Sequence, residues 1–299
     1  MPSQTLQISI THLGSLTVGY RLAAKINPSK PTLICINSMC MTSALFDAQF
    51  SDEALTAAVN LLAIEPLGHG QTSFPEKVAQ FTYWDSAIVA LEVMSCLGVE
   101  RAFAMGTSQG GWMVVRMGVL APERILGLLP LGTSIDAETT ESREKGCWNP
   151  TPLLHPFVEL WKSSTPTPDY IIDDTWCNMV ASFGFGSHAT PATTAFWTET
   201  IKSVYSGDEG RRKARMAVLC LLERDSLCLR VADVTCPVYW LQGSEDAPYG
   251  AQVQREQIEM FSRSRDARLS IVEGGAHYLN ATNPREVNGA VLDMLRKYA

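Results

Sequence analysis

Short apolar runs alternate with helical patterns along most of this chain, and this alternation limits the possible folds more than any other feature. A short run that is apolar on both faces is typical of a buried strand in a parallel sheet. Two edge-like strands, around Leu6–Thr11 and Ser15–Leu22, come first. The buried runs are Leu33–Ile36, Leu61–Ile64, Ala102–Met105, Ile125–Leu131, Val238–Leu241 and Leu269–Val272.

Helical patterns lie between several of these runs. Apolar residues recur at helical spacing in Tyr83–Cys96 and again in Val287–Leu295. A repeated strand–helix order is typical of a sheet that is covered on both sides. We therefore predict an α/β fold with a mostly parallel central sheet and helices on both faces.

The interval 137–231 breaks this rhythm. It is rich in proline, has a glycine-containing turn at Gly184–Gly186, and holds four of the seven tryptophans: Trp148, Trp161, Trp176 and Trp197. We predict a core domain made of residues 1–136 and 232–299, with residues 137–231 as an inserted, largely helical lid. Each tryptophan alone is typical of the insertion's own core, but as a group they suggest a broad apolar substrate pocket.

Composition excludes several classes of protein. The net charge is −7, and no basic stripe offsets it, which argues against nucleic acid and anionic membrane surfaces as partners. The densest basic run, Arg211-Arg212-Lys213 with Arg215, is expected to be a solvated helix face. No apolar run approaches the roughly 20 residues that span a bilayer, and no secretory signal is visible.

The eight cysteines are scattered without CxxC pairs. Scattered cysteines within apolar segments indicate reduced, buried thiols rather than a metal site. We therefore expect a cytoplasmic protein that needs no metal or other cofactor and acts on a small molecule. The sequence does not fix the number of subunits.

Gly106-Thr107-Ser108-Gln109-Gly110 carries the clearest chemical signal. It lies between the strand-like run Ala102–Met105 and the apolar, helix-like run that starts at Gly111. A serine on a sharp strand-to-helix turn is exposed for nucleophilic attack, and the helix N-terminus directs backbone N–H groups toward a developing oxyanion. We predict Ser108 as the nucleophile.

A nucleophilic serine needs a base, and the base needs an acid that fixes its tautomer. His277 follows the Leu269–Val272 run, so it lies at the carboxyl end of a parallel strand, on the same edge as Ser108. Glu245 and Asp246 follow the Val238–Leu241 run, and either could orient His277; we choose Asp246. The order Ser, Asp, His beyond strand ends matches where open α/β sheets build their sites.

An oxyanion needs at least two donors. One is the N–H of Gln109, directly after the nucleophile. The other is expected from the loop Asn37-Ser38-Met39-Cys40, after the Leu33–Ile36 run. We assign it to the Met39 N–H, with Ser38 as the alternative.

The order of these motifs resembles the α/β-hydrolase superfamily across essentially the whole chain. The asparagine-serine dipeptide in Ile36-Asn37-Ser38-Met39, with Phe46-Asp47-Ala48-Gln49 after it, is most similar to the oxoadipate enol-lactonase branch. The other matching pieces are Gly68-His69-Gly70, the Gly106–Gly110 turn, Gly243 with Asp246, and Gly275-Ala276-His277. The resemblance implies the α/β-hydrolase fold, the catalytic triad Ser108, Asp246 and His277, and the oxyanion donors Met39 and Gln109.

Two residues depart from the family pattern. Glu65 and Leu67 stand where the family usually has Asp and Arg, in the segment Glu65-Pro66-Leu67-Gly68-His69-Gly70. That arginine normally anchors the loop, so this chain must hold the loop in another way.

The leading hypothesis is a cofactor-free serine hydrolase that cleaves an ester or lactone of a fairly large apolar or aromatic small molecule through an acyl-enzyme. A second hypothesis keeps the site and changes the bond, to C–C cleavage, thioester hydrolysis or a non-hydrolytic lyase or cyclase reaction. A third is a small-molecule receptor with a vestigial triad. Assays on a panel of esters, lactones and diketones would separate the first two.

Overall fold

The computed structural model describes residues 3–299 and forms one mixed sheet of eight strands in the order β1-β2-β4-β3-β5-β6-β7-β8. Neighbours from β4 to β8 are parallel, whereas β2 is antiparallel to both β1 and β4. The predicted mostly parallel α/β sheet is therefore confirmed. The strands are β1 (Gln4–Ile10), β2 (Gly14–Leu22), β3 (Thr32–Ile36), β4 (Asn60–Ile64), β5 (Ala102–Thr107), β6 (Ile125–Leu131), β7 (Val238–Gly243) and β8 (Ala267–Val272).

Helices connect the strands and follow the predicted ranges closely where the apolar period is strong. The helix predicted over Tyr83–Cys96 has those bounds, and Thr82 and Asp85 form a reciprocal capping box that fixes where it begins. The helices are α1 (Asp47–Phe50), α2 (Glu53–Ala58), α3 (Tyr83–Cys96), α4 (Gln109–Leu120), α5 (Thr140–Glu144), α6 (Pro150–Leu160), α7 (Asp174–Phe185), α8 (Pro191–Val204), α9 (Gly207–Leu222), α10 (Ala251–Gln257), α11 (Leu279–Thr282) and α12 (Pro284–Tyr298). Short 3-10 turns are η1 (Ser43–Phe46), η2 (Gly186–His188), η3 (Val231–Asp233) and η4 (Ile258–Met260).

The sheet buries both of its faces, because alternate residues of each central strand point to opposite sides. In β3, Ile34 and Ile36 belong to the apolar cluster that includes α3 and α4. Leu33 and Cys35 belong to the second cluster, which includes α12. This arrangement explains why the central strands read as unbroken apolar runs in the sequence.

One predicted strand differs in burial. Leu269–Val272 was expected to be covered on both faces, but in β8 only Val272 is fully buried. β8 is the last strand of the sheet and pairs only with β7, so its other edge meets no strand. The exposed, charged Arg268 lies in this edge strand, and charged side chains are a common way to protect an edge.

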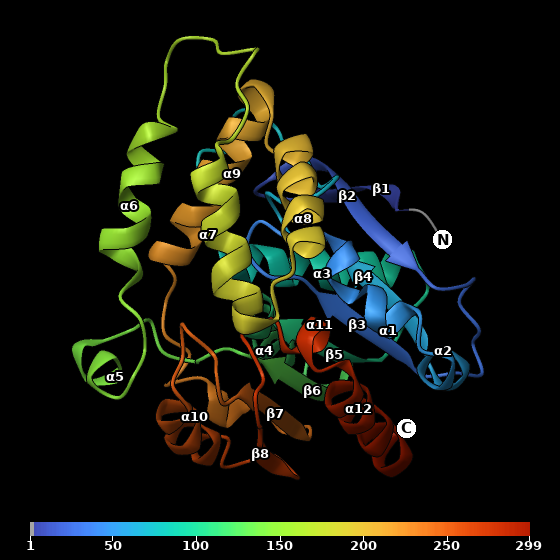
Figure 1. Cartoon of the computed structure of the whole chain (residues 1–299). Coiled ribbons are helices and arrows are strands. Elements are labelled where there is room, and N and C mark those ends of the chain that lie inside the picture. Colours follow the sequence, from blue (N-terminus) through green and yellow to red (C-terminus); the bar gives the residue numbers. More distant parts are fainter. Residues whose placement is uncertain (1–2) are drawn as a thin grey trace.

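Residues 137–231 lie between β6 and β7 and supply α5 to α9. Figure 1 shows α6, α7, α8 and α9 grouped together in the upper part of the view, away from α10 and β8 in the lower part. We call residues 137–231 the cap segment; its division from the core as a separate domain stays a prediction.

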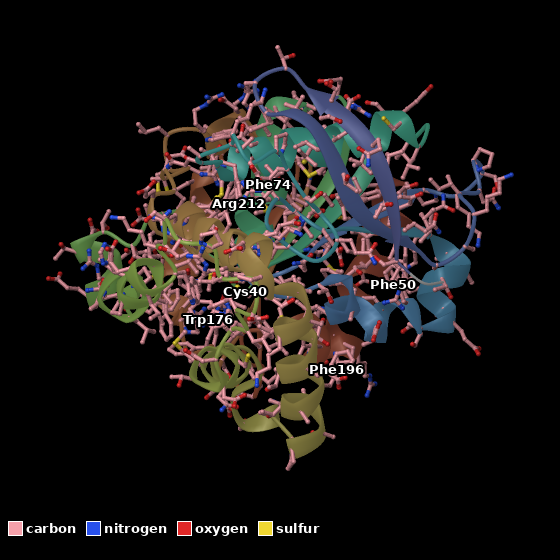
Figure 2. All side chains as sticks on the ribbon, turned by 90° about the horizontal axis from the view of Figure 1, so that it is seen from above. Cys40, Phe50, Phe74, Trp176, Phe196 and Arg212 are labelled. Carbon is pink, nitrogen blue, oxygen red and sulfur yellow. The ribbon has the colours of Figure 1, made fainter. Side chains whose placement is uncertain are left out.

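The basic run at 211–215 fastens α9 to neighbouring chain segments. The Arg212 guanidinium lies 4.4 Å from the centroid of the Phe74 ring and donates to the Phe74 carbonyl over 3.0 Å (Figure 2). Arg211 donates to the Trp161 carbonyl over 3.0 Å. Arg211 and Lys213 are both buried. The expectation of a solvated helix face was therefore wrong, because the long side chains fold back onto α9's neighbours and use their charged ends for hydrogen bonds.

Within residues 3–299, no helix has the length and apolarity that a bilayer span requires.

Candidate active site

Ser108 lies at the turn between β5 and α4, in a backbone conformation that few side chains adopt. Its φ is +55° and its ψ is −120°, a combination that stores strain and is common at functional sites. The Ser108 N–H donates to the Leu131 carbonyl of β6 over 2.8 Å. A Cβ on Gly110 would lie 2.1 Å from the Ile36 carbonyl oxygen, so only glycine permits this approach of α4 to β3. The sequence predicted this sharp strand-to-helix turn.

Asp246 and His277 form a buried pair across two strand ends. The Nδ1 of His277 lies 3.0 Å from Asp246 Oδ2, and the two side chains are 6% and 0% exposed. Asp246 Oδ1 also accepts the Tyr249 backbone N–H over 2.9 Å. With both carboxylate oxygens engaged, Asp246 fixes the ring of His277 so that Nδ1 carries the proton and Nε2 is free to accept one.

The structure separates the two acids that the sequence left as alternatives. Glu245 turns to the surface, where its Oε2 accepts the Ser187 hydroxyl over 3.0 Å, and only Asp246 contacts His277. Among the other histidines, His12 contacts Asp85 at the surface and His188 contacts the Gly274 carbonyl.

Gly132 is a site residue that the sequence analysis missed. It follows β6 with a φ of +51°. A Cβ there would lie 2.9 Å from Asp246 Oδ2 and 2.5 Å from the His277 carbonyl oxygen. A glycine directly after a buried strand was the available signal, but the sequence does not reveal which groups pack against it.

The loop after β3 lies beside Ser108. Ser38 and Met39 line the same cavity as Ser108 and His277. The side-chain amide of Asn37 donates to the carbonyls of Ser38 and Met41 over 3.0 and 2.8 Å, which ties the loop into a compact turn. Gln109 is the first residue of α4, so its N–H has no carbonyl partner within the helix. Both predicted oxyanion donors thus belong to segments that border the cavity.

His69 holds the side chain of Gln109 through a hydrogen bond. His69 Nδ1 contacts the Leu67 carbonyl at 2.8 Å, so Nδ1 carries the proton, and Nε2 accepts the Gln109 side-chain amide at 2.8 Å. Burial, together with the positive charge of nearby Lys213, lowers the pKa of His69 to about 4. A neutral His69 therefore keeps the residue after the nucleophile in place, which is a structural role rather than a catalytic one.

Glu65 holds the loop that contains His69, in place of the arginine that the family usually has there. Its Oε1 accepts both the backbone N–H and the hydroxyl of Ser43 over 3.0 Å. Its Oε2 accepts the Gln71 N–H over 2.7 Å. One buried carboxylate thus joins the segment that follows the predicted oxyanion loop to the loop containing His69.

The cavity at Ser108 is narrow and apolar, with a volume of about 40 Å³. Within the described chain, its lining contains no Asp, Glu, Lys or Arg. It is lined by Ser38, Met39, Ser108, Trp148, Leu153, Leu154, Met179, Val180, Phe183, Leu221, Pro248, His277 and Tyr278. A wider, more open hollow near residues 73–76 and 161–166 contains none of the predicted catalytic residues.

The structure brings only one of the four cap tryptophans to this cavity. Trp148 lines it and contacts the Phe183 ring, with centroids 5.6 Å apart. Trp161 and Trp176 are buried and stack edge to face at 4.7 Å. Trp197 is buried against Phe185 and Phe196, a pairing that leaves it outside the cavity lining. These three form the cap segment's own core, which the sequence could not distinguish from a pocket wall.

Burial raises the thiol pKa of every cysteine among residues 3–299, so none of these thiols is activated as a nucleophile. All eight cysteines there are free, and no group of His, Cys, Asp and Glu has a metal-binding arrangement. Burial raises the pKa of the Cys40 thiol, next to Met39, to about 12. That thiol is therefore protonated, and inert as a nucleophile, at neutral pH.

Comparison with known proteins shows which family this chain matches. The model of the "Alpha/beta hydrolase family" matches residues 33–290. A 113-residue stretch, 38% of this chain, is 26% identical to the "Putative carbamate hydrolase RutD" of Stutzerimonas stutzeri (strain A1501). That match spans 41% of the length of the carbamate hydrolase.

Two solved structures share the fold at low sequence identity. A thermophilic esterase from Thermogutta terrifontis superposes with a TM-score of 0.76 at 16% identity, covering 98% of both chains. The enol-lactonase from Burkholderia xenovorans LB400 superposes with a TM-score of 0.75 at 16% identity, covering 97% of this chain and all of the other. The resemblance drawn from the sequence motifs is confirmed at the level of the fold.

Proposed function

The chain belongs to the alpha/beta hydrolase family, and on that premise we propose that it hydrolyses an ester or lactone bond of a neutral, apolar small molecule, with Ser108 as the nucleophile. One observation carries the proposal. A strained serine at the end of β5 and His277, which is paired with the buried Asp246, border one apolar cavity. Nucleophile, base and orienting acid are the three parts that acyl transfer by serine requires.

The proposed reaction uses these three residues in turn. His277 Nε2 takes the Ser108 hydroxyl proton as Oγ bonds to the substrate carbonyl carbon, and Asp246 stabilises the imidazolium that results. The backbone N–H groups of Met39 and Gln109 hold the oxyanion; losing one such donor typically costs about 3–4 kcal/mol. His277 then protonates the leaving alkoxide. Water, deprotonated by the same His277, attacks the acyl-enzyme and releases the carboxylic acid.

The cavity lining supports a neutral substrate. Leu153, Leu154, Met179 and Phe183 offer apolar contacts, and among residues 3–299 no cationic side chain lines the cavity to pair with a carboxylate. An anionic substrate would lose its hydration without gaining an ion pair, which is costly.

The first experiment is labelling with a fluorophosphonate, followed by intact mass and peptide mapping. We expect one adduct, on Ser108, which is absent in Ser108→Ala and formed at least about 100-fold more slowly in His277→Ala. Ser203→Ala, which removes an exposed serine on α8, is the matched control. Hydrolysis retained by Ser108→Ala would overturn the mechanism.

A substrate panel tests the bond and the charge. Neutral lactones and esters of increasing chain length are compared with thioesters, a carbamate, a vinylogous diketone, and lactones that carry a carboxylate. We expect the neutral lactones and esters to have kcat/KM values at least about tenfold above those of their anionic counterparts. Preferred cleavage of the anionic lactones would contradict the assigned substrate class.

A further inference from the structure

A buried charge pair joins the two ends of the cap segment. Glu138 lies shortly after β6, and Arg224 lies shortly after α9. The Arg224 guanidinium donates to Glu138 Oε1, and each side chain is 2% exposed. Glu138 also has a φ of +49°, which is unusual for a residue with a side chain. Buried ion pairs contribute little net stability. A buried ion pair at a strained residue therefore indicates that the pair holds neighbouring groups in a particular position.

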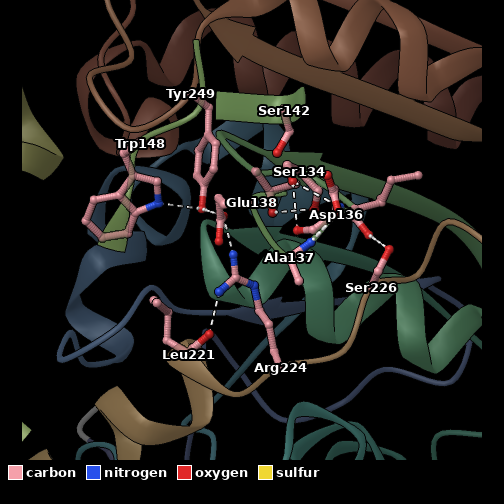
Figure 3. Close-up of polar contacts among 12 residues, drawn as sticks. Ser134, Asp136, Ala137, Glu138, Ser142, Trp148, Leu221, Arg224, Ser226 and Tyr249 are labelled. Carbon is pink, nitrogen blue, oxygen red and sulfur yellow. Dashed lines mark hydrogen bonds and ion pairs between the residues drawn. The ribbon is translucent and has the colours of Figure 1, made fainter. Parts of the chain in front are cut away.

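The same carboxylate holds a tyrosine. Glu138 Oε1 accepts the Tyr249 hydroxyl over 2.8 Å, and that hydroxyl accepts the Trp148 indole N–H over 3.2 Å. Figure 3 shows the chain of contacts from Arg224 through Glu138 and Tyr249 to Trp148. Burial raises the pKa of Tyr249 well above its ordinary value, so the hydroxyl stays protonated and donates a hydrogen bond to Glu138.

Tyr249 in turn contacts both members of the Asp246–His277 pair. Its backbone N–H donates to Asp246 Oδ1 over 2.9 Å, and its ring centroid lies 5.8 Å from that of His277. The Gln242 side chain donates to the Tyr249 carbonyl over 2.9 Å. The backbone of Tyr249 is thus held beside Asp246, and its ring lies beside His277. Its hydroxyl is held by the buried Glu138–Arg224 ion pair.

We propose that Glu138, held by Arg224, is a positioning residue that acts through Tyr249 on the Asp246–His277 pair and on the cavity wall at Trp148. This inference rests on the proposed function for its kinetic readout. The ring of Tyr249 packs beside His277 only while its hydroxyl is anchored. The same anchor sets how far Trp148 closes the cavity, so chemistry and substrate fit depend on one contact.

The test compares two tyrosine variants that each lose a hydroxyl bonded to a carboxylate. Tyr249→Phe removes the contact with Glu138. Tyr239→Phe, in β7, removes a contact with Asp266 of 3.1 Å and is the matched control. We expect Tyr249→Phe to lower kcat on a small ester about tenfold with KM unchanged, and to raise KM for a bulky ester, whereas Tyr239→Phe keeps wild-type values for both. Equal kcat and KM in the two variants would overturn the proposal.

A second set of variants removes the charge pair itself. Glu138→Gln leaves Arg224 buried without its counter-ion and can fail to fold, so the double variant Glu138→Gln/Arg224→Met is measured beside it. The double variant keeps the side-chain volumes and removes both charges. If positioning is the role, the double variant folds and its kcat still falls about tenfold; wild-type kcat in a folded double variant would overturn it.

A readout without substrate separates this proposal from the proposed function. The Nδ1 proton of His277 in its bond to Asp246 is followed by low-field proton NMR and assigned by its loss in His277→Ala. We expect the resonance to shift or broaden in Tyr249→Phe and to stay unchanged in Tyr239→Phe. A wild-type protein that reacts with no fluorophosphonate contradicts the proposed function, and the resonance then decides the positioning role alone: no shift in Tyr249→Phe overturns it.

Discussion

At the scale of single residues, the space around Asp246 and His277 leaves no room for an added atom at Gly132. An alanine there would bring a Cβ within 2.9 Å of Asp246 Oδ2 and would also strain a backbone at φ +51°. We expect Gly132→Ala to lower kcat at least about 100-fold, since a displacement of about 1 Å can have that effect. The measurement is ester hydrolysis by a variant whose folding is verified by circular dichroism.

The matched control is Gly289→Ala in α12, where an added Cβ meets no atom within 4 Å. Its activity should equal that of the wild type. Wild-type kcat in Gly132→Ala would mean that the pair can shift without loss, contrary to the assigned chemistry.

The residues of the candidate site differ in how clearly the sequence identifies them. Ser108 and His277 stand out in the sequence because motif and strand order place them at one sheet edge. Asp246 was chosen over Glu245 although both follow the same strand, and the geometry then shows that Asp246 is the one in contact with His277. Tyr249 and Glu138 carry no motif, and their importance arises from contacts across about 110 positions, a relation that local patterns do not encode.

At the scale of elements, α7 packs directly on the loop that carries His277. The Tyr278 N–H donates to the Gly184 carbonyl over 2.8 Å, and a Cβ on Gly184 would lie 1.9 Å from the Tyr278 ring. Helix propensity alone predicts that Gly184→Ala raises the free energy of unfolding by up to about 1 kcal/mol. We expect the opposite sign, a decrease of about 1–3 kcal/mol from overpacking, together with a lower kcat.

Urea unfolding gives the sign directly, and ester hydrolysis reports the effect on His277. Stabilisation with unchanged kcat would show that α7 can move away from Tyr278 at no cost, and that the cap segment is not coupled to the base.

Elements were predictable in proportion to how regular their environment is. The central strands and α3 read clearly, because burial on both faces or a capping box leaves a periodic signal. The cap helices were predicted only as a largely helical group. Their tryptophans pack against one another, as Trp161 and Trp176 do. A short apolar run such as β8 does not reveal whether it lies inside the sheet or at its edge.

At the scale of the whole molecule, His69 makes stability depend on pH. Its pKa is about 4 in the folded chain and 6.5 in the unfolded one, because burial disfavours the charged ring. Between these values the unfolded chain binds the extra proton, so stability is full above pH 6.5 and falls as the pH drops toward 4. From pH 7 to pH 5 we expect a loss of about 2 kcal/mol from this residue.

The difference between wild type and His69→Asn isolates that contribution from the carboxyl groups. The free energy of unfolding is measured in urea at pH 7 and pH 5, and the advantage of the wild type should shrink by about 2 kcal/mol at the lower pH. His155→Asn, at an exposed position in α6, is the control and should follow the wild type at both pH values. A constant advantage for the wild type over His69→Asn would contradict the buried, neutral state of His69.

The pairing of β6 with β7 has a consequence for how the protein is made. It joins Leu128 to Val238, so the partner strand leaves the ribosome about 110 residues after β6, a delay of roughly 5–20 s at ordinary rates of translation. During that time the nascent sheet ends in an open strand, which is a template for pairing with other chains. The yield of folded protein should therefore depend on how well this edge is shielded during synthesis, and slowing translation beyond β6 should favour aggregation.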